Sequence, residues 1–447
     1  MPLPAELADA ILRAVEARRE DLLQVAEGLI RIDSTNGSYP AAASSARGGE
    51  SLAGHLLGER CREIGMRVER VGPDPGRQNM VAVAPGRGKG PSLLLNGHLD
   101  TVPASDPASW TLADPRQPER RGNDLYGLGS ADMKGPLAAG WAALAALHDL
   151  GLQLDGEVQL HAVVGEEAME HELGTSAAIE AGFRADAAVN LEPTTLTLAT
   201  ASPGYQALKM RVVGRGTHHG NRQLSMRPGG ESVGVNALEK GLWVAQGMQE
   251  LERRWNEGDL HPWFPPGSFT IHPGTFVSVG APDLPAPVFF PAEAVLEYSL
   301  WYPPGWSAED VEDRVERFLS DWCADDPWLA EHPVEFEWSY DWPPFETARD
   351  EPIVASIAAA IEAVQGTPVP PPSPQAPAAV GASVDSTWIE RAGIPVVTFG
   401  PGKMRLAHSP DEHVGIDELV AAAQVLAIAI TSTCGSTQAK SSARPDR

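Results

Sequence analysis

The sequence predicts an α/β protein with a mixed, mostly parallel sheet, helices on both faces of that sheet, and an inserted α+β sandwich. Two observations support this prediction. Short apolar runs alternate with helical runs over about the first 200 residues, which is typical of parallel strands connected by helices. After about residue 200 the strands become alternating and half-exposed, and the order strand, helix, strand, helix fits a smaller α+β layer.

The first part begins with an expected amphipathic helix at 5–31, because Leu7, Ile11, Val15, Leu22 and Val25 fall roughly on one stripe. A polar loop is expected at 36–50. The other expected elements follow in chain order: a helix at 51–65, strands at 80–84 and 92–96, a helix at 133–150, a strand at 158–164, a helix at 175–181 and a strand at 187–191.

The second part is expected to form the inserted layer and then to return to the first sheet. The expected elements are a strand at 205–213, a helix at 232–254, a Pro- and aromatic-rich stretch at 261–290, a strand at 294–301 and a helix at 308–323. The chain returns at 341–351, followed by a helix at 352–365, a Pro-rich loop at 367–379, a strand at 395–399 and a helix at 416–432. The Ser/Lys/Arg-rich tail from Gly435 is predicted to be frayed.

Composition excludes several classes of protein. A formal net charge of −26 argues against nucleic acid and against an anionic membrane surface, because both bind through Lys and Arg. Three widely spaced cysteines provide no disulfide framework, which favours a reducing compartment. The N-terminus lacks an apolar secretory core, and the apolar runs 137–147 and 419–430 are shorter than the roughly 20 residues of a bilayer span. We therefore expect a cytoplasmic protein.

Five separated motifs carry the residues that could do chemistry: NGHLDTVP (96–103), GLGSADMKG (127–135), VVGEEA (163–168), NLEP (190–193) and LAHSPDEH (406–413). Several of them follow apolar, strand-like runs, and ligands of open α/β sheets collect at the carboxyl ends of the strands. Together the motifs supply two histidines, one shared aspartate and two glutamates, which is a ligand set for two divalent metal ions. An adjacent spare glutamate can act as a base.

Each motif taken alone also has a plainer interpretation. His98 and Asp100 point the same way on an extended strand, so Asp100 can accept the second ring N–H of His98, but the pair could equally be a strand-end histidine beside a solvated carboxylate. Asp132 could be an ordinary helix N-cap. Glu166 and Glu167 diverge at a strand end, where one could bind metal while the other faces substrate, or both could be solvated.

Three further features of the motifs shape the prediction. Glu170, His171 and Glu172 are interpreted as exposed turn residues without a role. The last motif offers both His408 and His413 as ligands. The HxxEH and HExxH spacings of helical zinc sites are absent, so the site must be assembled from loops.

The order and neighbourhood of the five motifs resemble the M20 metallopeptidases, which include aminoacylases, carboxypeptidases and the acetylornithine and succinyl-diaminopimelate deacylases. The resemblance covers roughly residues 20–435. It implies that His98 and Glu192 bind one metal ion, that Glu167 and His408 bind the other, and that Asp132 bridges them. Mixed His and carboxylate ligation suits Zn²⁺, while Co²⁺ or Mn²⁺ could substitute.

The resemblance also implies a domain organisation and further roles. Residues 1–200 and 343–435 would form the catalytic domain, 201–342 an inserted lid and dimerisation domain, and 436–447 a tail. Glu166 would be the general base and Asp100 the partner of His98. His218, in VVGRGTHHGNR, resembles the histidine that binds the oxyanion across the dimer, and Asn236 resembles a lid residue that contacts substrate.

One position departs from the resemblance. Many members of the family carry an arginine on the last lid strand that grips the substrate carboxylate, whereas Ser299 and Trp301 occupy the corresponding Asp-x-Arg positions here. Tryptophan offers one N–H donor and cannot make a bidentate grip. Either the GPGK turn, with Gly400 and Gly402, binds the carboxylate, or the substrate lacks one there.

The sequence therefore predicts a homodimeric, dinuclear-metal amide hydrolase that cleaves a small N-acyl amino acid or a related amide. A dipeptidase or carboxypeptidase on the same scaffold is the first alternative. A non-catalytic protein that binds an amino-acid-like ligand is the second, although it would require a missing ligand or base, and none is missing.

Overall fold

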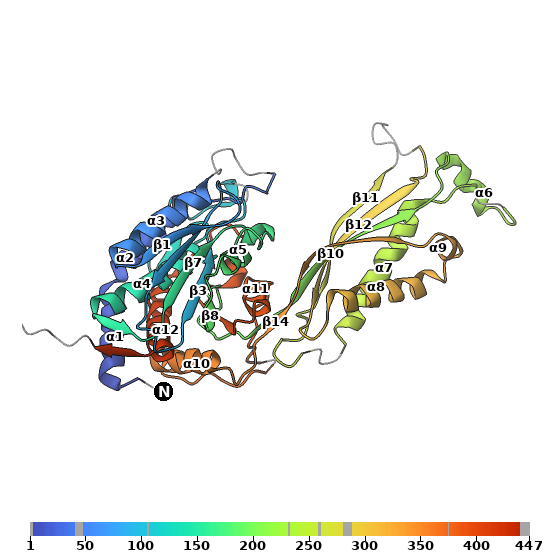
Figure 1. Ribbon diagram of the computed structural model, residues 1–447. Helices are drawn as coiled ribbons and strands as arrows, with labels where there is room; N and C mark the ends of the chain where they lie inside the picture. The colour runs from blue at the N-terminus through green and yellow to red at the C-terminus, as the bar shows by residue number, and fades with distance from the viewer. Residues whose placement is uncertain are drawn as a thin grey trace, which may run out of the picture. The chain divides into compact units, whose positions relative to one another are not determined.

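The computed structural model describes residues 3–40, 48–104, 107–230, 233–257, 261–279, 288–373 and 375–438. The chain divides into two compact units, which are described separately (Figure 1). The first unit comprises Met1–Ser202, Phe345–Pro372 and Ala378–Arg447, and the second comprises Pro203–Pro344 with Ser373–Pro377.

The first unit is built on a six-stranded sheet in the order β1-β2-β7-β3-β8-β15. Five of these strands run in one direction, and β2 is antiparallel to both of its neighbours. The strands are β1 (Arg67–Val71), β2 (Asn79–Ala84), β3 (Leu93–His98), β7 (Val158–Val163), β8 (Ala187–Asn190) and β15 (Val396–Thr398). The predicted mixed, mostly parallel sheet is confirmed.

The central strands are buried on both faces, which explains why their sequences are mostly apolar. One face packs on long helices in a large core that includes Leu93 and Leu95, and the other packs on α5 and α11 through Leu94 and Ala188. The helices of this unit are α1 (Ala5–Ala17), α2 (Arg19–Ile30), α3 (Gly49–Glu63), α4 (Lys134–Asp149), α5 (Thr175–Glu180), α10 (Pro352–Gln365), α11 (Ser386–Arg391) and α12 (Ile416–Cys434).

Short strand pairs complete the first unit. They are β4 (Glu119–Arg121), β5 (Asp124–Tyr126) and β16 (His413–Gly415) in one sheet, β6 (Leu152–Leu154) with β17 (Ser436–Gln438), and β9 (Ala201–Ser202) with β14 (Phe345–Glu346). Helix α12 has the length and hydropathy of a membrane span, but it is mostly buried and packs against α4 and α10 as a core helix.

Two expectations for the first unit are corrected. The single helix at 5–31 is two helices, because Arg18 leaves helical geometry (φ −91°, ψ 3°). Its guanidinium then binds the carboxylate of Asp149 at the end of α4. The tail expected to fray from Gly435 instead pairs with β6 over Ser436–Gln438, and the rest of the tail lies outside the described residues. Part of the polar loop expected at 36–50 also lies outside them.

The second unit is a four-stranded antiparallel sheet, in the order β11-β12-β10-β13, covered on one face by two long helices (Figure 1). Alternate residues of β10 and β12 are buried, as the half-exposed patterns predicted. The strands are β10 (Gly204–Val213), β11 (Ile271–Val279), β12 (Glu293–Tyr302) and β13 (Glu335–Trp342). The helices are α6 (Arg222–Met226), α7 (Ala237–Trp255), α8 (Ala308–Cys323) and α9 (Pro327–Glu331).

Capping side chains set where the long helices of the second unit begin. The side-chain oxygen of Asn236 accepts the backbone N–H of Leu238 at 3.0 Å, so α7 begins at Ala237 rather than at 232 as expected. Ser307 and Asp310 form a capping box at the start of α8. Strand β11 lies within the stretch at 261–290 that was predicted only as Pro- and aromatic-rich, and β13 was not predicted.

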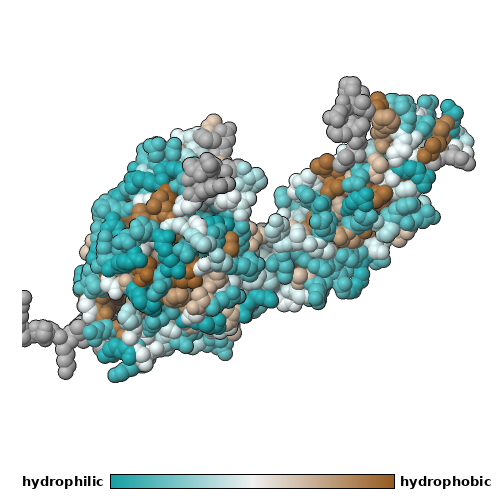
Figure 2. Space-filling model, turned by 45° about the horizontal axis from the view of Figure 1, so that its top comes forward, coloured by the Kyte–Doolittle hydropathy of each residue, from teal (hydrophilic) through white to brown (hydrophobic). Residues whose placement is uncertain are grey.

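The visible surface is mainly hydrophilic, with hydrophobic side chains interspersed on both units (Figure 2). Several exposed apolar side chains belong to α6, α7, β11 and the segment after residue 288 in the second unit: Met226, Leu238, Leu242, Phe276, Val277 and Phe289.

Candidate metal centre

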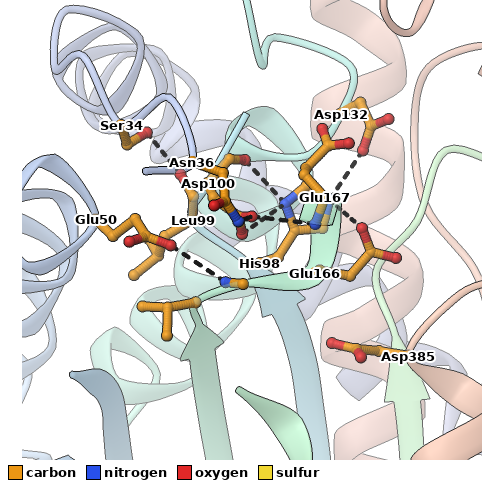
Figure 3. Close-up of polar contacts among 12 residues, drawn as sticks. Ser34, Asn36, Glu50, His98, Leu99, Asp100, Asp132, Glu166, Glu167 and Asp385 are labelled. Atoms are coloured by element: carbon orange, nitrogen blue, oxygen red, sulfur yellow. Dashed lines mark hydrogen bonds and ion pairs between the residues drawn. The ribbon is translucent and has the colours of Figure 1, made fainter. Parts of the chain in front are cut away.

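The candidate residues meet at the carboxyl edge of the large sheet. His98 is the last residue of β3, Glu166 and Glu167 follow β7 after Gly165, and Glu192 follows β8. Because β3, β7 and β8 are parallel neighbours, their carboxyl ends lie at the same edge. Asp132 joins them from the turn before α4 (Figure 3).

Asp132 lies between two histidines. Its Oδ1 is 3.1 Å from Nε2 of His98, and its Oδ2 is 3.5 Å from Nε2 of His408. Nε2 of His408 is also 2.9 Å from Oε2 of Glu167, and Nε2 of His98 is 3.9 Å from Oε1 of Glu192. Each oxygen of one carboxylate therefore faces a different histidine, and each histidine has a further carboxylate beside it.

The cluster is buried except on one side. The side chains of His98, Asp132, Glu167 and Glu192 are at most 8% exposed, whereas that of His408 is 52% exposed. His408 also has a left-handed backbone (φ 57°), a conformation that costs free energy in a residue with a side chain. The cluster is thus open to solvent at His408.

The electrostatics of the cluster suit cations. Burial raises the pKa values of Glu166 and Glu192 well above their usual range, and the negative charges of neighbouring carboxylates raise them further. Burial by itself lowers the pKa of His408, but its hydrogen bonds to Asp132 and Glu167 raise it to about 11. In the protein without cations, the carboxylates can be stabilised only by holding protons on themselves or on the histidines.

The donor atoms also fit metal ions by type and spacing. Ligand atoms of His98, Asp132 and Glu167 all lie within 4.8 Å of one another. Oε1 of Glu192 is buried without a hydrogen-bond partner among the described residues. An unpaired anionic oxygen in such a site is costly unless a cation is bound to it. Imidazole nitrogen and carboxylate oxygen are donors that Zn²⁺ accepts.

Glu166 lies about as close to His98 as the proposed ligand Glu192 does. Oε2 of Glu166 is 3.8 Å from Nε2 of His98, and its side chain is 13% exposed. In Figure 3 the carboxylate of Glu166 lies beside the His98 ring, and the side chains of Glu166 and Glu167 point in different directions. The two adjacent glutamates diverge, and a role of Glu166 in proton transfer stays a prediction.

The structure corrects how Asp100 supports His98. Nδ1 of His98 is 3.0 Å from the backbone oxygen of Asp100, whereas the Asp100 carboxylate is 3.6 Å from it. Oδ2 of that carboxylate instead accepts the backbone N–H of Glu167 at 3.0 Å and the amide of Asn36 at 2.8 Å. The backbone carbonyl therefore orients His98, and the carboxylate orients Glu167 (Figure 3).

Glu412 was missed in the sequence, although it lies in the same motif as His408. Its buried carboxylate accepts the backbone N–H groups of Gly129, Ala131 and Asp132 at 3.1, 2.8 and 3.0 Å. Burial raises its pKa to about 8. Glu412 thus ties the turn that carries Asp132 to the segment that carries His408.

The contacts of His413 are with residues outside the cluster. Its ring packs on Tyr126 with centroids 4.7 Å apart, and its Nδ1 is 2.9 Å from the backbone oxygen of Asp411. Of the two histidines in LAHSPDEH, His408 is therefore the one that lies beside Asp132 and Glu167.

The expected substrate-binding residues have structural partners of their own. The backbone N–H of Gly400 binds Thr194, and that of Gly402 binds Glu418. His218 and Asn236 belong to the second unit. The His218 ring stacks on His219 at 4.5 Å, and Asn236 caps α7. A role in substrate binding for these four residues stays a prediction.

The chain is similar to known proteins along most of its length. The model for peptidase family M20/M25/M40 matches residues 94–432. An N-formyl-4-amino-5-aminomethyl-2-methylpyrimidine deformylase of Halalkalibacterium halodurans is 31% identical, over 95% of this chain and 97% of that protein. An acetylornithine deacetylase of Vibrio atlanticus is 27% identical, over 92% of this chain and 98% of that protein.

Solved structures share the fold at low sequence identity. Human carnosine dipeptidase 1 superposes with a TM-score of 0.69 at 16% identity, covering 97% of this chain and all of that one. A dinuclear metal-binding peptidase of the M20 family from Bacillus subtilis superposes with a TM-score of 0.64 at 14% identity, covering 94% of this chain and 99% of that one.

Proposed function

Since this chain belongs to peptidase family M20/M25/M40, and its relatives include amide-cleaving deformylases and deacetylases, we propose that it is a dinuclear-metal amide hydrolase with Glu166 as general base. The observation that carries the proposal is the placement of Asp132, whose two oxygens face His98 and His408 separately. A carboxylate in that position is suited to bridge two cations.

His98 and Glu192 would hold one ion, Glu167 and His408 the other, and Asp132 both. Bound divalent ions polarise a carbonyl and bring the pKa of a water near 7, which is the chemistry they would supply here. The ligand types favour Zn²⁺, with Co²⁺ or Mn²⁺ as substitutes.

The chain's own residues account for the proton transfers. Glu166 would accept a proton from the attacking water and deliver it to the nitrogen of the leaving amine. The C–N bond of the amide breaks, the water oxygen stays on the acyl carbon, and a carboxylic acid and an amine are released. In the protein without cations, burial and the neighbouring carboxylates raise the pKa of Glu166.

The assignment of His408 can be tested against His413. We expect His408→Ala to lose about one metal equivalent per chain, because its Nε2 is beside both Asp132 and Glu167. His413→Ala is the matched control and should keep both equivalents. Metal content of the purified variants, measured by atomic emission after reconstitution, decides between them. An unchanged content in His408→Ala with a loss in His413→Ala would move the ligand to His413.

Besides the dipeptides of the alternative function, two substrate classes fit this site. A small N-acyl amino acid is the first, as in acetylornithine deacetylase. The second is an N-formyl aminomethylpyrimidine, which has no carboxylate, as in the pyrimidine deformylases. Trp301 favours the second class, because it has no positive charge with which to bind a substrate carboxylate. Its ring packs on that of Tyr205, with the ring centroids 5.2 Å apart. Ser299 lies 3.3 Å from the Tyr205 hydroxyl, and it is also neutral.

A substrate panel tests the proposed function. Metal-reconstituted protein is assayed with N-formylaminomethylpyrimidine, N-acetylornithine, N-succinyl amino acids and dipeptides. We expect hydrolysis of at least one of these amides. We also expect kcat/KM for the formylated pyrimidine to exceed that for N-acetylornithine by at least about 10-fold, a difference of about 1.4 kcal/mol. Preference for dipeptides would support the dipeptidase alternative, and no hydrolysis of any amide would refute the proposal.

Three further expectations remain part of the proposal. The protein would be a homodimer through its second unit, His218 would supply a hydrogen bond to the oxyanion, and the protein would act in the cytoplasm. A single donor of this kind contributes about 2.7–4 kcal/mol to transition-state stabilisation. The exposed apolar side chains of α7 and β11 support the dimer.

A further inference from the structure

The loop that carries Glu166 and Glu167 has little regular structure to hold it. It follows β7 and includes two residues with left-handed backbones, Gly165 (φ 87°) and Met169 (φ 60°). Within the loop, the backbone N–H of Met169 binds the oxygen of Glu166, and that of Glu170 binds the oxygen of Gly165, both at 2.8 Å. These bonds close a compact turn, but they do not attach it to the rest of the unit.

Side chains from three other segments attach the turn. Glu50 of α3 accepts the backbone N–H of Gly165 at 3.2 Å. Asp100, after β3, accepts the backbone N–H of Glu167 at 3.0 Å. The Tyr39 hydroxyl donates to the backbone oxygen of Glu167 at 2.6 Å. Figure 3 shows Glu50 and Asp100 with the dashed lines that mark their contacts.

Arg77 connects these attachments. Its Nε and Nη2 bind the two oxygens of Glu50 at 2.6 and 2.9 Å, and its Nη1 binds Oε2 of Glu170 at 2.7 Å. Asn36 extends the connection, because its amide lies 3.4 Å from the same oxygen of Glu170 and 2.8 Å from Asp100. Glu170 is therefore not the idle turn residue that the sequence suggested.

The ion pairs of Arg77 are more buried than is usual for ion pairs that only stabilise a fold. Its side chain is 15% exposed, and those of Glu50 and Glu170 are 5% and 26% exposed. Desolvation offsets most of the stabilisation from a buried ion pair, whereas the fork of a guanidinium fixes the geometry of the groups it binds. One cation here holds two carboxylates, one on α3 and one on the turn with Glu166 and Glu167.

We propose that Arg77 is a positioning residue, which fixes the turn 165–170 against α3 and thereby places Glu166 and Glu167 for metal binding and proton transfer. This inference rests on the proposed function for its consequence in catalysis. The placement of the turn by Arg77 does not depend on the proposed function.

Arg77→Met and Arg77→Lys test the inference, with Arg120→Met as matched control. Arg120 also binds two carboxylates of the first unit, those of Glu20 and Glu27, but both lie on α2. Three quantities are measured: exchange of backbone amide hydrogens in 164–174 without metal, affinity for Co²⁺ titrated into the metal-free protein, and kcat and KM at saturating metal for the best substrate of the panel.

We expect Arg77→Met to increase amide exchange in 164–174 by about 10-fold or more. The affinity for one Co²⁺ equivalent and kcat should each fall by about 10- to 100-fold, as when other groups that orient ligands are removed. KM should change by less than about 3-fold, since Arg77 does not contact substrate in this proposal. Arg77→Lys should recover part of each loss, and Arg120→Met should show none of them.

Folded Arg77→Met with wild-type exchange, Co²⁺ affinity and kcat would overturn the inference. If Arg77→Met does not fold, Arg77→Lys decides, because lysine keeps the charge but cannot bind both carboxylates as a fork. Wild-type protein that binds no Co²⁺ and cleaves no amide would refute the proposed function. The exchange measurement would still decide whether Arg77 fixes the turn.

Discussion

Glu166→Gln is expected to lower kcat by about 10²- to 10⁴-fold, because an amide cannot accept a proton from the attacking water. Metal content should stay at the wild-type value, since Glu166 is not among the proposed ligands and its side chain diverges from that of Glu167. The substitution keeps the size of the side chain and removes one negative charge from a crowded cluster. Kinetics at saturating substrate, with metal analysis of the same sample, measure both effects.

Glu172→Gln is the matched control for this prediction. It makes the same chemical change six residues further along the chain, in a side chain that is 72% exposed and contacts only His171 among the ion pairs described. Its kcat should equal that of the wild type. If Glu166→Gln retained both metals and turned over within about 3-fold of the wild type, the general base would have to be another group.

Asp132→Asn is expected to abolish metal binding and to lower activity by more than about 100-fold, beyond the loss typical of groups that merely orient ligands. The carboxylate faces both histidines, and an amide cannot bridge two cations. Calorimetry shows the loss in a second way. Zn²⁺ at about 100 times its Kd should raise the free energy of unfolding of the wild type by about 2.7 kcal/mol. This stabilisation should disappear in Asp132→Asn.

Asp186→Asn is the control for that change. Asp186 accepts the backbone N–H and the hydroxyl of Ser92, both at 2.8 Å, just before β3 at the amino edge of the same sheet. Loss of such hydrogen bonds costs about 0.5–1.5 kcal/mol each, so the variant should unfold at a lower temperature but keep its metal and activity. Full metal content in Asp132→Asn would remove Asp132 from the bridging position.

The sequence predicted the elements that position the site because each has a strong local signal. The strands β3, β7 and β8 are mostly apolar runs that end in a histidine or precede a glutamate, and a parallel sheet brings such ends together. The family and the enzymatic class were likewise readable from the five motifs, and the comparisons confirm both. Strand β13 was missed although its sequence, EFEWSYDW, alternates strictly between polar and aromatic residues, a pattern typical of a strand, and most of its residues are exposed.

The tertiary structure alone decided how the site is supported. Nδ1 of His98 binds the backbone oxygen of Asp100, because the Asp100 carboxylate accepts the backbone N–H of Glu167 instead. Asp100 and Glu167 are 67 positions apart in the sequence. The bonds from Glu412 to the turn of Asp132 span about 280 positions. Local sequence patterns record which faces of a strand or helix are buried, but contacts between distant loops depend on the path of the chain through the folded unit. For this reason the candidate ligands could be proposed from the sequence, whereas the contacts that Glu412 and Arg77 make with the segments carrying them could not.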